Sequence, residues 1–325
     1  MSLRAGFRRW RSHRLPRPTF CRSHSRNMRP RVRNDDPLCT ESSPHRRPDP
    51  HPFLPVLHVS EHFLVVDKPA DMRIDGDAFP VTVERLAQRW LDRAPASLAA
   101  QWQPTGMRRV GHVLQPLPPP RVRLVHQLDY ATSGVMLLAL QRVPAAHAVA
   151  AFARRAMHKE YRALVHGWML GGRIGTTIML TWPIQACADD FRMQVGKRSA
   201  ADTDATARPA ITRVQLLAVG TCAGVPVSDV LVQPETGRRH QIRVHLQAAG
   251  HGIVGDATYP TRPDETQRFP RMMLHAWRLH LPATLVHQFG LPQTLQAPLP
   301  VEFAEMQREV EDRRRVESKC RHVQE

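Results

Sequence analysis

One short polar stretch, residues 126–134 with the sequence HQLDYATSG, combines residue types that can do chemistry. It places Asp129 directly after an apolar run, in a turn rich in hydroxyl side chains and closed by Gly134. A carboxylate held at the edge of a sheet beside apolar walls can act as a nucleophile or as a general base. The alternative is a structural carboxylate that caps its own turn. On its own, the stretch leaves both interpretations open.

A second stretch, residues 236–245 with the sequence TGRRHQIRVH, concentrates cationic side chains. The spacing predicts a helix over residues 238–249, with Arg239 and Arg243 four positions apart on one face. Arg238 and Gln241, three positions apart, would share another face. Guanidinium groups on such a helix suit phosphate oxygens or a buried carboxylate. The alternative is a solvated basic face.

Metal chemistry is disfavoured by the same residues. His240 and His245 have neither Glu nor Cys at a spacing typical of metal ligands. The five cysteines are scattered and form no CxxC pair, which argues against a zinc ribbon, a disulfide framework and a thioredoxin-like site. We therefore expect no metal site, and a reducing compartment.

Together, these stretches resemble motifs of the RluA-type family of RNA pseudouridine synthases. The resemblance covers about residues 56–303 and implies an isomerase that needs no cofactor or metal. Such an enzyme breaks the N1–C1′ bond of a uridine in RNA, rotates the uracil and rejoins it through C5. The other matching segments, in the family's order, are FLVVDKPADMRID (63–75), KEYRALVHG (159–167), PETGRRHQIRVHLQAAGHGIVGDATY (234–259), MLHAWRLHLP (273–282) and APLPVEF (297–303).

The resemblance also implies roles for individual residues. Asp129 matches the essential aspartate, which attacks C1′ or removes the proton from C2′. Arg243 matches the arginine that pairs with that aspartate, which favours the ionised carboxylate. Tyr161 matches the tyrosine that stacks on the flipped base and can assist proton removal at C5. Ile242 matches the apolar residue that walls the pocket. An aromatic ring would offset part of the cost of extruding a base.

Two positions depart from the family pattern. Gln127 stands where most members carry an arginine implicated in base flipping, and an amide lacks the charge and the planar fork. The HQLD variant, with RID at 73–75, is similar to the eukaryotic group of RNA pseudouridylate synthase domain-containing protein 1. Asp67 replaces the usual Asn. The next residue, Lys68, is expected either to contact the RNA backbone or to be solvated, and Asp256 to hold a Gly-flanked turn.

The elements around these motifs predict an α+β fold with a mixed, largely antiparallel sheet and flanking helices. We expect the RNA-binding cleft to cross the sheet with Asp129 at its floor, in a protein that is a monomer. Glycines and prolines predict a long loop over residues 103–121 and small polar residues another over 196–208. The predicted strands lie within 57–68, 124–128, 134–140, 160–165, 211–219, 227–232 and 272–281, and the predicted helices at 82–93 and 145–156.

Charge is distributed unevenly along the 325 residues, which carry 46 Lys+Arg, 29 Asp+Glu and a net charge of +17. Residues 1–34 contain eleven arginines and no acidic residue. We interpret residues 1–55 as a basic arm: a mitochondrial transit peptide, an RNA-contacting arm or nuclear signal, or a solvated tail. A cytoplasmic or nuclear location is the alternative to a mitochondrial one. Residues 56–303 would form the catalytic domain and 304–325 a charged tail.

Composition also narrows the classes of function. No run approaches the roughly 18 apolar residues that a membrane span needs, which argues against a membrane protein. The leading hypothesis is a pseudouridine synthase acting on structured RNA, either tRNA or rRNA. Gln127 motivates a second hypothesis, a catalytically weak RNA-binding or RNA-folding factor that keeps the basic groove. A third is an Asp-dependent hydrolase that releases free uracil, since the first chemical step would be the same.

Overall fold

The computed structural model describes residues 53–102, 107–110, 113–116, 120–188, 190–196, 206–266 and 268–300. Most of the predicted basic arm and of the loop over 196–208, and the whole tail over 304–325, lie outside these residues, so their bounds stay predictions. The strands are β1 (Val56–Val59), β2 (Phe63–Lys68), β3 (Met107–Val110), β4 (Val113–Pro116), β5 (Arg123–Leu124), β6 (Ser133–Ala139), β7 (His158–His166), β8 (Thr177–Leu180), β9 (Ile184–Ala186), β10 (Met193–Val195), β11 (Thr212–Cys222), β12 (Val225–Pro234), β13 (Leu274–His280) and β14 (Thr294–Gln296). The helices are α1 (Val83–Asp92), α2 (Ala96–Gln101), α3 (Arg142–Ala153), α4 (Gln241–Ala248), α5 (Pro263–Thr266) and α6 (Ala283–Phe289), with a 3₁₀ turn η2 (Met169–Gly172).

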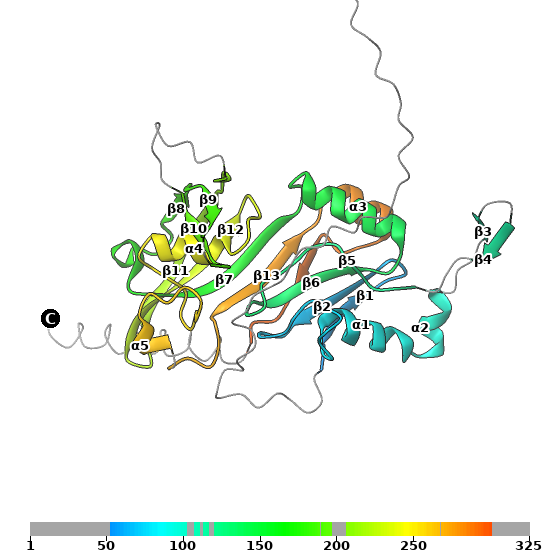
Figure 1. The fold of residues 1–325 in the computed structure, drawn as a ribbon, viewed down its shortest axis with the longest axis horizontal. Helices are drawn as coiled ribbons and strands as arrows, with labels where there is room; N and C mark the ends of the chain where they lie inside the picture. Colours follow the sequence, from blue (N-terminus) through cyan, green and yellow to red (C-terminus); the bar gives the residue numbers. More distant parts are fainter. Residues whose placement is uncertain are drawn as a thin grey trace, which may run out of the picture.

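A single long sheet dominates the fold (Figure 1). Its strand order is β1-β2-β6-β13-β7-β12-β11-β8, with β14 added to β13 and β5 added to β6. The pairs are antiparallel except β6 with β13, which is parallel. The predicted α+β fold with a mixed, largely antiparallel sheet is therefore confirmed.

The parallel contact between β6 and β13 depends on a glycine. Gly134 has φ +117°, and a Cβ at this position would lie 2.2 Å from the carbonyl oxygen of Ala276. Any other side chain would push the two strands apart. Gly134 therefore allows the strand that follows the Asp129 turn to reach the centre of the sheet.

Apolar clusters cover both faces of the β2–β6 part of the sheet. Along β6, Val135 and Leu137 belong to one cluster, while Met136 and Leu138 belong to the other. The first cluster includes residues of α3 and α6, and the second includes residues of α1. Burial of both faces explains why β6 reads as a continuous apolar run.

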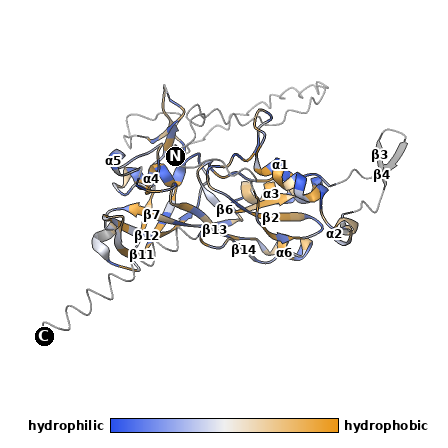
Figure 2. Cartoon of the chain, turned by 90° about the horizontal axis from the view of Figure 1, so that it is seen from below, coloured by the Kyte–Doolittle hydropathy of each residue, from blue (hydrophilic) through white to orange (hydrophobic). Residues whose placement is uncertain are grey.

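Helix α1 follows its sequence pattern closely and confirms the helix predicted over 82–93. The hydroxyl of Thr82 caps it by accepting a hydrogen bond from the backbone N–H of Arg85 at 3.1 Å. Its buried residues, Val83, Leu86 and Leu91 among them, lie at helical spacing and face the second cluster. Figure 2 shows the resulting mixture of hydrophilic and hydrophobic residues around α1. No helix in the described ranges is long and apolar enough to cross a membrane.

Three local predictions are wrong. The strand expected within residues 124–128 is not formed, because β5 ends at Leu124 and residues 125–128 belong to the loop that carries Asp129. Residues 103–121 are not one long loop, because β3 and β4 pair as an antiparallel hairpin within them. The prolines and glycines predicted turns across the whole segment, but Met107–Val110 and Val113–Pro116 pair as short strands between them. Helix α4 begins at Gln241, three residues later than predicted, since His240 adopts a left-handed conformation with φ 53°.

Candidate active site

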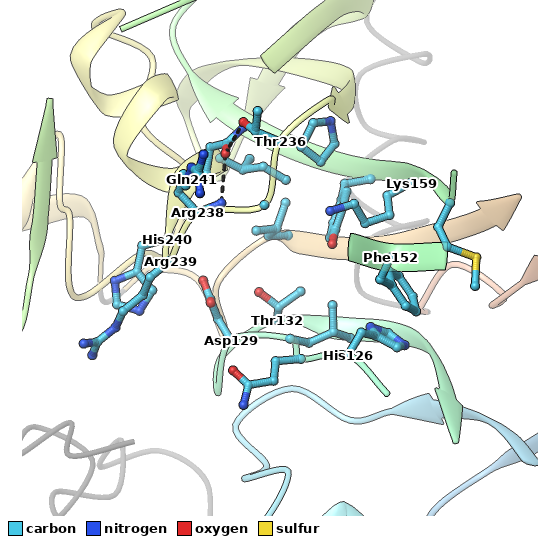
Figure 3. Close-up of a pocket in the computed structure, with 18 of the residues that line it drawn as sticks. His126, Asp129, Thr132, Phe152, Lys159, Thr236, Arg238, Arg239, His240 and Gln241 are labelled. Carbon is cyan, nitrogen blue, oxygen red and sulfur yellow. Dashed lines mark hydrogen bonds between the residues drawn. The ribbon is translucent and has the colours of Figure 1, made fainter. Parts of the chain in front are cut away.

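Six of the eight predicted catalytic and binding residues line one open cavity of about 640 Å³, whereas Arg243 and Lys68 lie behind its wall. Its walls come from the loop between β5 and β6, the first half of β7, the turn after β12 and the start of α4. Figure 3 shows Asp129 on the loop that also carries His126 and Thr132, facing the turn that carries Arg238 and Arg239. The lining residues include Gln127, Asp129, Tyr161, Arg238, Arg239 and Ile242.

The Asp129 turn is held from behind by a buried lysine. The ammonium of Lys68 donates to the carbonyl oxygens of Tyr130 and Thr132, both at 2.8 Å, and of Pro69 at 2.9 Å. The Thr132 N–H also donates to the carbonyl of Asp129 at 3.1 Å. Because its main chain is fixed this way, Asp129 presents its carboxylate to the cavity from a preorganised turn.

This geometry corrects the expectation for Lys68. Its exposed fraction is 0%, so its side chain neither contacts an RNA backbone nor is solvated. Burial lowers the pKa of Lys68 to about 7, against the opposing effect of nearby Asp71. A neutral amine can donate only two hydrogen bonds, so the three carbonyl contacts correspond to the ammonium form.

Arg243 connects Asp129 to a second, fully buried carboxylate. Its Nη1 lies 3.4 Å from Oδ2 of Asp129, while Nε and Nη2 donate to the two oxygens of Asp256 at 2.7 and 2.8 Å. Burial opposes the charge of Arg243, yet Asp256 and Asp129 together hold its pKa above the usual value. Arg243 therefore stays cationic and keeps one edge directed at Asp129.

Asp256 does more than hold a turn. It accepts hydrogen bonds from the backbone N–H groups of Thr258 and Tyr259 at 2.9 and 3.1 Å, as predicted, and the same carboxylate orients Arg243. The ring of Tyr259 lies 4.9 Å from Cζ of Arg243 and adds a cation–π contact. The only sequence signal was the Gly-Asp pair in GIVGDATY, which does not indicate a partner.

Tyr161 lies on β7 and lines the cavity, where it is largely buried. Burial and the Asp129 charge raise the pKa of its phenol well above the usual range. The phenol is therefore protonated at neutral pH and suits stacking and hydrogen bonding better than the role of a free phenolate base. Ile242 and Leu274 supply apolar walls beside it.

The basic turn before α4 has a different geometry from the predicted helix face. The Gln241 side-chain oxygen accepts from the Thr236 hydroxyl at 2.7 Å and from the Arg238 N–H at 3.0 Å, as dashed in Figure 3. These contacts close a turn, so Arg238 and Arg239 precede the helix and do not share its faces with Gln241 and Arg243. Arg238 also donates to the carbonyl of Pro209 at 3.1 Å, whereas the side chain of Arg239 is exposed.

Two further side chains shape the cavity. His126 stacks on Phe152 with 4.6 Å between ring centroids, and its Nε2 accepts from the Leu137 N–H at 2.9 Å. Burial lowers the pKa of His126 to about 3, so the ring is neutral. Lys159, two residues before Tyr161, points into the cavity (Figure 3), and burial lowers its pKa. Sequence reasoning did not single out Lys159, although it opens the KEYRALVHG motif.

The part of the chain that the structure describes holds no cluster of metal-binding side chains. No three His, Cys, Asp or Glu residues there are placed to hold a metal ion. Both ring nitrogens of His245 are already within hydrogen-bonding distance of protein oxygens, those of Thr212 and Trp182 at 2.9 Å. His240 likewise contacts the Tyr259 hydroxyl at 2.8 Å.

The fold and the pocket define an RNA-modifying isomerase of the pseudouridine synthase class. The family model described as RNA pseudouridylate synthase matches residues 62–248. The chain belongs to this RNA pseudouridylate synthase family and is an RNA pseudouridine synthase. The predicted family is thereby confirmed.

Individual relatives agree with this assignment. RNA pseudouridylate synthase domain-containing protein 1 of Mus musculus is 33% identical over 233 residues, which cover 70% of this chain and 68% of the relative. tRNA pseudouridine synthase C of Yersinia pestis is 30% identical over 242 residues, which cover 70% of this chain and 81% of the relative. The solved structure of human RNA pseudouridylate synthase domain containing 1 matches with a TM-score of 0.56 at 30% identity, covering 78% of this chain and 86% of that chain.

Proposed function

We propose that this cavity converts uridine to pseudouridine in structured RNA, with Asp129 as the catalytic residue. The observation that carries the proposal is the one-sided pairing of Asp129. Arg243 contacts one of its oxygens at 3.4 Å, and the carboxylate otherwise opens onto the cavity. A carboxylate with a free oxygen beside a fixed cation can take part in a reaction and still be stabilised as an anion.

The reaction is an isomerisation and needs no external reactant. The N1–C1′ bond breaks, the uracil rotates, the C5–C1′ bond forms, and the hydrogen lost from C5 is balanced by one gained at N1. Asp129 either attacks C1′ or removes the C2′ proton, and both routes use the same open oxygen. Tyr161 would stack on the extruded uracil, which offsets part of the unstacking cost. Ile242, an apolar residue of the cavity wall, would help to exclude water from the bound uracil.

The rim of the cavity and the names of the relatives support an RNA substrate. Exposed Arg239 and partly exposed Arg238 supply attraction to phosphates that does not depend on sequence. The Yersinia pestis relative is named for tRNA, whereas the mouse relative is named for RNA in general. We infer a uridine in tRNA or rRNA as the substrate.

The test is a transcriptome-wide pseudouridine map of cells that lack the protein, rescued with wild type or with Asp129→Asn. Sites that disappear and return only with wild type would support the proposal and identify the RNA. Unchanged sites, with RNA still crosslinked to the protein, would contradict catalysis and favour the RNA-binding factor suggested by Gln127. Free uracil in a reaction with purified protein would favour the hydrolase.

Location and assembly are part of the same proposal. The eleven arginines of residues 1–34 support a mitochondrial transit peptide, with a cytoplasmic or nuclear protein as the alternative. Residues 1–55 fused to a fluorescent reporter should direct it to mitochondria, and a diffuse cytosolic signal would contradict this. We also propose a monomer, which light scattering of the full chain would test.

A further inference from the structure

Arg73 reaches the cavity from the segment between β2 and α1. Its main chain is fixed, because its carbonyl accepts from the Val83 N–H and the Ile74 carbonyl accepts from the Glu84 N–H, both at 2.9 Å. The neighbouring side chains of Met72 and Ile74 are buried in the second apolar cluster. The side chain of Arg73 therefore projects toward the cavity from a rigid support.

The guanidinium of Arg73 contacts aromatic rings and no carboxylate among the described residues. Its Cζ lies 3.9 Å from the ring centroid of Phe79 and 5.8 Å from that of Tyr130. Among the residues that the structure describes, it has no hydrogen bond or ion pair. A flat cation stacked on one ring, with unpaired N–H donors, is preorganised to stack on or hydrogen-bond another flat group.

The local charge argues against a phosphate ligand. Asp71, Asp75 and Asp77 lie within four positions of Arg73 in the sequence DMRIDGD, so the segment carries three carboxylates and one guanidinium. A segment with this excess of negative charge does not attract an RNA backbone. The basic turn with Arg238 and Arg239 follows β12, which three strands separate from β2 in the sheet. The two sides of the cavity therefore offer different chemistry: phosphate attraction after β12, and a stacking cation after β2.

We propose that Arg73 contacts the bases beside the target uridine, stacking in the space that the uridine leaves when it enters the cavity. This inference rests on the proposed function, since it requires a uridine to be extruded. Extrusion costs a few kcal/mol because stacking and pairing are lost. Gln127, which is exposed at the same cavity, can accept and donate hydrogen bonds there but offers no charge.

The experiment compares extrusion with conversion in the full-length chain. The probe is an RNA hairpin taken from the RNA that crosslinks to the protein in cells, with 2-aminopurine beside the target uridine. One version pairs the uridine with adenine, and the other leaves it unpaired. Fluorescence reports extrusion, and pseudouridine content after a single turnover reports conversion. Extrusion remains measurable in Asp129→Asn, so a failure of the proposed catalysis would be seen separately from a failure of the Arg73 proposal.

Arg73→Ala should slow extrusion of the paired uridine on the order of tenfold and leave the unpaired probe within about threefold, as expected for one stacking contact. The salt dependence of binding should be unchanged, because no phosphate contact is lost. Arg73→Lys should also be slow, since an ammonium cannot stack as a plane. Arg239→Ala is the matched control and should weaken binding of both probes with a shallower salt dependence.

Three results would overturn the proposal. Equal losses on both probes would place Arg73 in a structural role, which melting curves of the variant would reveal as reduced stability. Full rescue by Arg73→Lys, together with a shallower salt dependence in Arg73→Ala, would identify a phosphate contact. Unchanged extrusion in Arg73→Ala would exclude any role at the mouth of the cavity. Phe79→Leu removes the supporting ring but keeps the cation, and it should slow extrusion less than Arg73→Ala does.

Discussion

Two arginine–carboxylate contacts of this protein differ in burial and in function: one stabilises the sheet, and the other leaves a carboxylate available at the cavity. On the face away from the cavity, Arg162 of β7 binds Asp229 of β12 through both Nε, at 3.2 Å, and Nη2. On the cavity side, Arg243 reaches Asp129 with one nitrogen at 3.4 Å. The side chain of Asp229 is 3% exposed, and that of Asp129 is 26% exposed. The buried contact is closed on both sides, while the cavity contact leaves the carboxylate available.

The difference shows how one residue type performs two tasks. Successive residues of β7 point to opposite faces, so Tyr161 faces the cavity and Arg162 faces away. Arg162 uses its planar fork to neutralise one carboxylate. Arg243 uses Nε and Nη2 to bind Asp256, and only its Nη1 contacts Asp129. A catalytic carboxylate thus gains a fixed cation without losing both oxygens to it.

The strongest test of this comparison is Asp129→Asn. We expect the rate of pseudouridine formation to fall on the order of 1,000-fold, because the amide is neither a nucleophile nor a base. The free energy of unfolding should change by less than about 0.5 kcal/mol, since the carboxylate is partly exposed and has one long contact. Single-turnover kinetics and urea melts measure the two effects. A variant that kept a tenth of the wild-type rate would refute the assignment.

Asp229→Asn should give the converse result. Breaking a buried ion pair leaves an uncompensated charge on Arg162 and should lower the free energy of unfolding by about 3–5 kcal/mol. The rate per folded molecule should stay within about threefold, because the pair faces away from the cavity. The control is Arg213→Ala, which breaks an exposed pair with Glu235 at 3.7 Å and should cost less than about 1 kcal/mol. Equal costs for the two variants would contradict the role given to burial.

Asp256→Asn should lower both the rate and the stability, unlike Asp129→Asn, which affects the rate, and Asp229→Asn, which affects the stability. The amide can no longer accept from both nitrogens of Arg243, so the guanidinium loses its orientation toward Asp129. Loss of a charged hydrogen bond predicts a rate about 10- to 100-fold lower, together with a loss of stability of about 1.5–3 kcal/mol. Rates measured at saturating RNA separate this effect from weaker binding. If RNA affinity fell while the saturated rate held, Asp256 would be a binding determinant instead.

The last test concerns pH and the polar groups behind the Asp129 loop. His275 is fully buried against Ser133, with 2.8 Å between Nδ1 and Oγ, and burial lowers its pKa to about 3. Between pH 6.5, the approximate pKa of His275 in the unfolded chain, and about pH 3, His275 is protonated in the unfolded chain but neutral in the folded chain. Stability should therefore fall as pH drops below about 6.5, by up to about 1.4 kcal/mol per pH unit. Above that range, His275 should contribute no slope.

Denaturant melts between pH 7 and pH 4 check this expectation. His275→Gln should reduce the slope, because it removes one of the groups that bind a proton only in the unfolded state. His126→Gln is the matched comparison, since burial also lowers the pKa of His126 to about 3 and its loss should reduce the slope in the same direction. An unchanged slope in His275→Gln would contradict the role given to this residue.

Local patterns predicted most of the sheet, and the family resemblance predicted Tyr161, Ile242 and Gln127 at the cavity, but local patterns failed where distant residues decide. The apolar run of β6 and the capped pattern of α1 are properties of neighbouring residues, so the sequence predicts them. Burial of Lys68 depends on carbonyls 62 and 64 residues away, which no local pattern records. The late start of α4 likewise depends on Gln241 folding back onto Thr236.

The anchoring of Arg243 illustrates the same limit at the active site. Its pairing with Asp129 was available only through the family resemblance, since the two residues are 114 positions apart. Its contact with Asp256, 13 positions away, required knowing that the chain turns back after α4. In both cases the residue types were visible, but the tertiary fold selected the partners.

The parallel contact between β6 and β13 sets an order of events during protein synthesis. Ser133 and His275, which the pairing brings together, are separated by 142 positions. A nascent chain therefore carries the Asp129 turn long before the strand that completes its surroundings has left the ribosome. Contacts this distant in sequence form slowly, and until then the unpaired edge of β6 is exposed. A growing fragment that ends before β13 therefore carries the Asp129 turn and the Lys68 side chain that holds it, but lacks the strand that pairs with β6.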